Sequence, residues 1–111
     1  MSYQVKITEY AVEQLREIHR YISGTLQAPA SAAQWMQRIR KEMASLNSFP
    51  NRFPLTPEEP WRTEGIRRMP VENFLVYYWV NTETATIWIT AVIYGRRDQA
   101  MALRTMPEIS E

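Results

Sequence analysis

Two pairs of arginines flank the most apolar stretch of the sequence. Arg67 and Arg68 precede this stretch, and Arg96 and Arg97 follow it. A guanidinium group binds phosphates and carboxylates through parallel hydrogen bonds, but it is a poor proton donor at neutral pH. We predict that the four arginines bind a target or a partner, with guanidinium groups converging on a phosphate or a carboxylate. The alternative is that they are solvated charges that keep a sheet edge from aggregating.

Groups suited to proton transfer are scarce near these arginines. Cleavage of RNA through its 2′-hydroxyl needs a base and an acid whose pKa values lie near the working pH. The only histidine, His19, is far away in the sequence, and the nearby carboxylates are Glu72 and Asp98. We therefore expect binding and no catalytic residue. If the protein were a nuclease, Arg68 and Arg97 would be the candidates.

Aromatic side chains are concentrated in the same stretch. Nucleic acid bases can stack on such side chains. Both faces of this stretch are apolar, however, and aromatic residues in such strands usually belong to the core. We interpret the following residues as core: Tyr77, Tyr78, Trp79, Trp88 and Tyr94.

The composition indicates one globular domain, which we expect to span residues 1–111. Hydrophobic residues make up 45% of the chain, which is enough for a packed core. There is no cysteine and only one histidine, so we expect no metal site and no cofactor. The net charge of +1 gives no general attraction to nucleic acid. There is no apolar run of membrane-spanning length and no signal peptide pattern, so we expect no membrane contact and a cytoplasmic protein.

The stretch between the arginine pairs is predicted to form an antiparallel hairpin. Two runs rich in β-branched and aromatic residues, Phe74–Val80 and Thr86–Tyr94, are joined by a short polar turn. Because a hairpin reverses the chain, we expect the two arginine pairs to lie near each other at one end of the sheet. Consecutive strand residues point to opposite faces, so one arginine of each pair would face the side without helices.

Hydrophobic spacing predicts the elements of the N-terminal half. Alternating polar and apolar residues predict a strand at Tyr3–Ile7. A helix follows, capped by Thr8 and ended by Gly24. A second helix is expected from about Ser31 to Leu46, antiparallel to the first because the connection is short.

A proline-rich loop over residues 49–65 precedes the hairpin. We expect it to be ordered, with Phe49, Phe53 and Trp61 as its anchors. An additional strand is expected at Gly65–Met69, leading into the hairpin.

A last short helix is expected from Gln99 to about Thr105, with Asp98 as its N-cap. Helices followed by consecutive strands predict an α+β fold. Its expected form is an antiparallel β-sheet with a helical hairpin packed on one face and a short C-terminal helix.

Six short segments, taken together and in order, resemble those of a known family. They are Y-Q-V-K-I at Tyr3–Ile7, A-x-x-x-L-x-x-I-x-x-Y-I at Ala11–Ile22, L-x-x-F-P at Leu46–Pro50, G-I-R-R-M at Gly65–Met69, F-L-V-Y-Y at Phe74–Tyr78 and V-I-Y-G-R-R-D at Val92–Asp98. The ordered set is similar to the RelE/ParE superfamily of toxins from bacterial type II toxin–antitoxin systems. The resemblance implies a β-α-α-β-β-β fold and a cognate antitoxin whose C-terminal segment wraps the toxin. We expect that segment to be amphipathic and to pack on the helical hairpin or pair with a sheet edge.

Within this superfamily, the resemblance separates two branches. The RelE-like branch cleaves mRNA in the ribosome. At the positions of the lysines of that branch, this chain has Arg67 and Arg68. The arginine that follows the last strand in that branch corresponds to Arg97. The strand arginine and the C-terminal tyrosine of that branch fall at Leu75 and near Leu103. These departures match the ParE-like branch, which is associated with DNA gyrase inhibition and plasmid stabilisation. We therefore expect a ParE-like toxin that binds DNA gyrase. The alternatives are a ribosome-dependent mRNA endoribonuclease of the RelE type and an inactive family member that serves as a binding module.

Overall fold

The computed structural model of the protein describes residues 2–108. None of the helices in this part of the chain is long and apolar enough to cross a membrane. The elements are β1 (Gln4–Ile7), α1 (Glu9–Arg20), a π-helical turn (Tyr21–Thr25), α2 (Pro29–Ala44), a 3₁₀ turn (Ser45–Asn47), β2 (Arg67–Val71), β3 (Phe74–Asn81), β4 (Thr86–Tyr94) and α3 (Gln99–Leu103).

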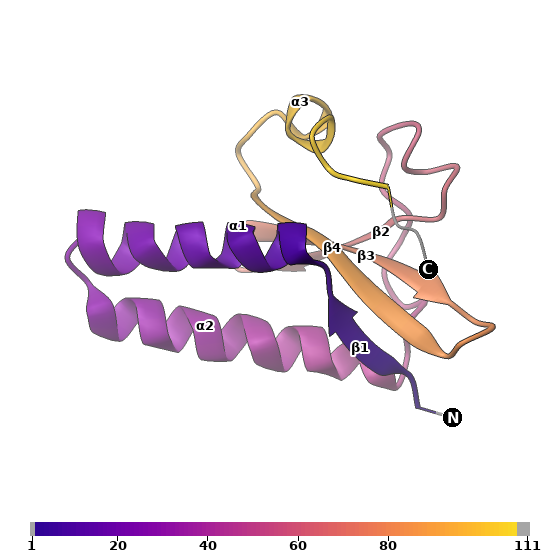
Figure 1. Ribbon diagram of the computed structural model, residues 1–111, viewed down its shortest axis with the longest axis horizontal. Helices are drawn as coiled ribbons and strands as arrows, with labels where there is room; N and C mark the ends of the chain where they lie inside the picture. Colours follow the sequence, from indigo (N-terminus) through magenta and orange to yellow (C-terminus); the bar gives the residue numbers. More distant parts are fainter. Residues whose placement is uncertain (1, 109–111) are drawn as a thin grey trace.

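Four strands form one sheet in the order β1-β4-β3-β2, and α1 and α2 lie side by side against it (Figure 1). β3 pairs antiparallel with both β2 and β4, whereas β1 joins β4 in parallel. Parallel neighbours need a long connection between them, and the helical hairpin is part of that connection. The predicted α+β class and order of elements are confirmed, and β1 makes the sheet mixed.

The first helix begins where the sequence predicts. The hydroxyl of Thr8 accepts a hydrogen bond from the backbone N–H of Ala11 at 3.2 Å, as expected of an N-cap. Gly24 lies inside a further helical turn and does not end the helix, because the N–H of Leu26 donates to the carbonyl of Tyr21 at 2.9 Å. This wider turn leaves the side chains of Tyr21 and Leu26 more than half exposed.

The larger core lies between the helical hairpin and the sheet. Apolar residues of α2 recur at the predicted helical spacing and face the sheet, where alternate residues of β3 and β4 meet them. The buried members of this core are Ala11, Leu15, Trp35, Ile39, Met43, Leu46, Met69, Val71, Val76, Tyr78, Ile87, Ile89 and Val92.

The opposite face of the sheet is also covered by a helix, contrary to the expectation of a helix-free side. Leu103 of α3 and Met106 pack there against Tyr77 and Ile93 of the sheet. Trp61 from the proline-rich loop joins this second core. The short terminal helix provides this cover because apolar residues at its end are drawn to the apolar strand face.

Two of the three predicted loop anchors are confirmed. Trp61 is only 8% exposed and Phe53 is partly buried, but Phe49 is 70% exposed, so its prediction as an anchor is wrong. The loop is held beside Phe49 through its backbone instead. The hydroxyl of Tyr78 donates to the carbonyl of Pro50 at 2.7 Å.

The variant Ile39→Ala should lower the free energy of unfolding by about 2–5 kcal/mol. Ile39 is completely buried between α2 and the sheet, and truncation would leave a cavity there. The matched control, Arg40→Ala, changes the next and exposed residue and should stay within about 0.5 kcal/mol. Urea denaturation followed by circular dichroism measures both, and equal stability of the two variants would contradict this packing.

Candidate functional site

The structure separates the two arginine pairs that the sequence predicts to converge. Arg67 and Arg68 begin β2, where they lie opposite Tyr78 and Tyr77 in the middle of β3. The second pair follows the end of β4, beyond the hydrogen-bonded part of the sheet. The predicted convergence is therefore wrong.

A second reversal of the chain explains the separation. The chain turns at Glu72 and Asn73 between β2 and β3, as well as between β3 and β4, so β2 and β4 run in the same direction. The start of β2 consequently lies level with the middle of β3 and β4, whereas the second pair lies beyond one end of the sheet. Arg68 is level with Ala91, five residues before Arg96. Standard strand dimensions then give a separation of roughly 20 Å between the two pairs.

Arg67 holds the proline-rich loop. Its Nη1 donates to the carbonyl oxygen of Phe53 at 2.7 Å. The neighbouring hydroxyl of Tyr78 binds the same loop, and burial raises the pKa of this tyrosine, which keeps the hydroxyl a neutral donor. These contacts give Arg67 a structural role.

Arg68 points to the other face and meets a carboxylate. Its Nη1 lies 3.7 Å from Oε2 of Glu58, and the two side chains are 30% and 18% exposed. Burial raises the pKa of the adjacent Tyr77, and the Arg68 guanidinium partly opposes that shift. Arg68 is therefore half-buried and paired with a carboxylate of the same molecule.

Arg96 and Arg97, in contrast, are exposed, and neither has a side-chain hydrogen bond or ion pair with any residue from 2 to 108. Their turn is nevertheless fixed. Nε2 of Gln99 donates to the carbonyl oxygens of Tyr94 and Arg97 at 2.9 Å each. Oε1 of Gln99 accepts a hydrogen bond from the hydroxyl of Tyr77 at 2.7 Å. The two guanidinium groups thus project from a turn that is anchored in the core.

A surface groove of about 730 Å³ lies beside Arg97, between α1 and the end of β4, and we call it the α1–β4 groove. An exposed apolar surface of this kind typically marks a site of interaction with another protein. Glu17 and Arg97 place one charge of each sign in its wall. Its apolar lining consists of Ile18, Tyr21, Ile22, Leu26, Phe74, Val92, Ile93 and Tyr94.

Sequence reasoning missed this groove. Ile18 and Ile22 have the spacing of a buried stripe, so the sequence assigns them to the core, and both do contact it. The feature of the sequence that could have indicated the groove is the pair of large apolar residues at the helix end, Tyr21 and Leu26. Only the π-helical turn shows that these two side chains are held in solvent.

The candidate proton-transfer groups have other roles in the structure. Oδ1 of Asp98 accepts a hydrogen bond from the N–H of Met101 at 3.2 Å and caps α3, as predicted. Glu72 lies 3.9 Å from Arg38 of α2. His19 lines a shallow hollow of α1 and α2 among basic side chains. Within residues 2–108 there is no group of histidine, aspartate and glutamate side chains arranged to hold a metal ion.

The fold and this surface define a class of protein. It is a small α+β protein with a helical hairpin on a four-stranded sheet, an exposed apolar groove and an unpaired arginine turn. The sequence model of the family described as the ParE toxin of the type II toxin–antitoxin system parDE matches residues 5–99. The chain therefore belongs to the ParE toxin family, and it is a type II toxin of the RelE/ParE superfamily.

Solved structures of toxins share the fold. A chain of the chromosomal ParDE system from P. aeruginosa has 23% identity and a TM-score of 0.68, with 84% of this chain and 96% of that chain covered. A chain of the RelBE2 complex from Mycobacterium tuberculosis has 21% identity and a TM-score of 0.57, with 85% of this chain and 99% of that chain covered. The third structure is E. coli RelE in the free state, with two arginine-to-alanine changes. It has 13% identity and a TM-score of 0.59, with 92% of this chain and 93% of that chain covered. No curated protein is significantly similar in sequence.

The two arginine pairs should differ in their effect on stability. Arg67→Ala removes the charged donor to the Phe53 carbonyl and should lower the free energy of unfolding by about 1.5–3 kcal/mol. Arg96→Ala, which removes an exposed side chain, serves as the control and should change it by less than about 0.5 kcal/mol. Chemical denaturation measures both, and a larger loss in Arg96→Ala would contradict the assigned roles.

Proposed function

We propose that the protein acts in the cytoplasm as a toxin that binds and inhibits DNA gyrase, and that a cognate antitoxin neutralises it. We assign target binding to Arg96 and Arg97. The observation behind this proposal is the exposure of these two guanidinium groups on a fixed turn, without partners among residues 2–108. Because the backbone of the turn is already fixed, only the two side chains have to order when they bind carboxylates or phosphates of a target.

Two features favour binding over RNA cleavage. Asp98, the carboxylate adjacent to the arginines, is engaged as a helix cap. Leu103, which lies near the position of the C-terminal tyrosine in the RelE-like branch, is completely buried. Asp98 and Leu103 therefore supply neither a free base nor an acid beside Arg97, and efficient general acid–base catalysis requires both.

The α1–β4 groove is the surface to which we assign the antitoxin. An amphipathic helix can place apolar residues against Tyr21, Leu26 and Phe74 and expose its polar face to solvent. An acidic residue of that helix would meet Arg97 at the groove wall. Because Arg97 belongs to both surfaces, an antitoxin bound in the groove would cover part of the target-binding turn. One segment could thereby neutralise the toxin.

The target is tested with purified protein in two assays, supercoiling by DNA gyrase and mRNA cleavage in a translating extract. We expect inhibition of supercoiling, weakened about tenfold or more in Arg97→Ala and Arg96→Ala. Arg40→Ala, an exposed arginine on α2, should inhibit like the unchanged protein.

Two outcomes would overturn this assignment. Transcript cleavage with normal supercoiling would identify a ribonuclease of the RelE type. Harmless overexpression without antitoxin would indicate an inactive member that works as a binding module.

The antitoxin surface is tested with Leu26→Glu. This change places a carboxylate in the apolar groove and should weaken binding of the co-encoded antitoxin about tenfold or more, with gyrase inhibition retained. Ala33→Glu adds the same charge to an exposed position of α2 and is the matched control. Calorimetric titration measures both affinities; equal affinities in the two variants would remove the groove from the antitoxin interface.

A further inference from the structure

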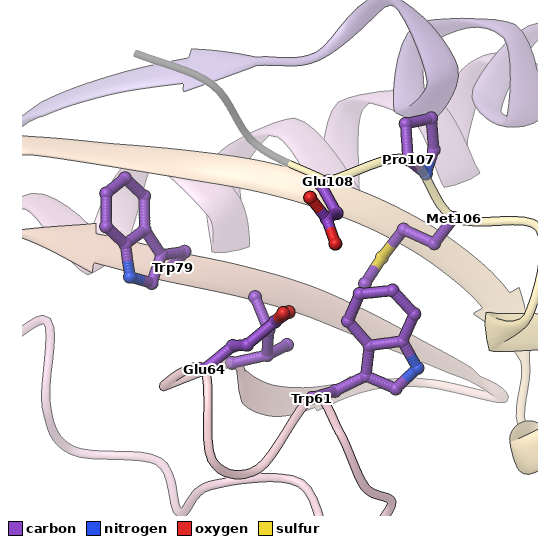
Figure 2. Close-up of a pocket in the computed structure, with 7 residues that line it drawn as sticks. Trp61, Glu64, Trp79, Met106, Pro107 and Glu108 are labelled. Carbon is purple, nitrogen blue, oxygen red and sulfur yellow. The ribbon is translucent and has the colours of Figure 1, made fainter.

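A second pocket lies on the face of the sheet that α3 covers, between the loop before β2, strand β3 and the segment after α3. Its volume is about 260 Å³. Figure 2 shows Trp61 and Trp79 on two sides of it, with the carboxylates of Glu64 and Glu108 between them. The side chain of Met106 forms a further part of the wall. We call it the two-tryptophan pocket.

The two carboxylates in this pocket are unpaired. Neither Glu64 nor Glu108 makes a side-chain hydrogen bond or an ion pair with any residue from 2 to 108. Glu58, on the same loop as Glu64, shows the contrast, because it pairs with Arg68. Both side chains are exposed, and two unpaired carboxylates in one pocket wall give it a local negative charge. A positively charged guest is attracted to that charge.

The tryptophans make a guanidinium group the most suitable guest. The face of an indole ring attracts cations, and the attraction grows as water is removed. Trp61 is 8% exposed and Trp79 is partly buried, so the walls of the pocket are already shielded. A guanidinium stacks on an aromatic ring and donates to carboxylates in the same plane, whereas an ammonium group is more strongly hydrated and lacks this planar geometry.

An adjoining cavity of about 430 Å³ shares Pro107 and Glu108 with the two-tryptophan pocket. Its lining includes Trp88 and Thr90. The indole N–H of Trp88 and the hydroxyl of Thr90 are buried without a hydrogen-bond partner in the described part of the chain. The adjoining cavity gives room for the chain on either side of a bound arginine side chain. This favours a peptide over a small cation as the guest.

We propose that the two-tryptophan pocket binds the guanidinium group of an arginine in a segment of a partner protein, with the backbone of that segment in the adjoining cavity. This surface shares no residue with the α1–β4 groove or with the turn at Arg96 and Arg97. The inference therefore goes beyond the proposed function and holds or fails independently of gyrase.

The test is a titration of the full chain, followed by the indole N–H resonances of its four tryptophans. The probes are methylguanidinium and the blocked peptide acetyl-Gly-Arg-Gly-amide. Both should shift the signals of Trp61 and Trp79. The peptide should also shift Trp88 and bind at least about threefold more tightly, because its backbone adds contacts. Trp35 lies on α2, in the core on the other face of the sheet, so its signal should not shift.

Variants that each remove one carboxylate charge and keep the side-chain shape complete the experiment. Glu64→Gln and Glu108→Gln should each weaken peptide binding by about fivefold or more, whereas Glu83→Gln in the exposed β3–β4 turn should not. The same peptide with lysine in place of arginine should bind less tightly. Thermal unfolding shows whether each variant remains folded.

The contrary outcomes are equally defined. Unchanged affinity in both folded glutamine variants, or no shift of Trp61 and Trp79, would overturn the pocket as a cation site. Methylguanidinium binding as tightly as the peptide, without a response at Trp88, would overturn the peptide as its guest.

Discussion

Two consecutive tyrosines in the middle of β3 fix the structure on both faces of the sheet. Tyr77 and Tyr78 are completely buried, and because neighbouring strand residues point to opposite faces, each belongs to a different core. The hydroxyl of Tyr78 donates to the carbonyl of Pro50, and that of Tyr77 donates to Gln99. These two hydrogen bonds tie the proline-rich loop and the start of α3 to the middle of β3.

The roles of the arginines follow from this arrangement. Arg67 and Arg68 lie opposite the two tyrosines, and each serves the face to which it points, through the Phe53 carbonyl and the Glu58 carboxylate. Arg96 and Arg97 come after the last paired residue of β4 and remain exposed. Residues of the same type thus have structural roles in one pair and are available to a target in the other. The difference lies in burial and in the nearest acceptor.

The surface also separates its charges, although the net charge is only +1. The turn at Arg97 is basic and adjoins the apolar α1–β4 groove, whereas Glu64 and Glu108 make the two-tryptophan pocket acidic. These surfaces lie mainly against different cores, one beneath the helical hairpin and one beneath α3. Partners with opposite charge requirements could therefore occupy the protein together. Local charge, and not the total, determines which partner is attracted to which face.

The sequence alone determined the local structure and much of the fold. Alternation and helical spacing predicted the strands and both long helices. The hydroxyl of Thr8 and the carboxylate of Asp98 predicted where two helices start. The order of elements predicted the α+β class. These features depend on neighbouring residues, whose spacing can be seen in the sequence.

Only the tertiary structure decided how the surfaces are composed. The turn at Glu72 and Asn73 reverses the chain once more than the hairpin alone and separates the arginine pairs. The exposure of Phe49, the α1–β4 groove and the meeting of Trp61 with Trp79 likewise depend on segments that are distant in the sequence. Their packing is the sum of many weak contacts across the fold, and no short sequence pattern records that sum.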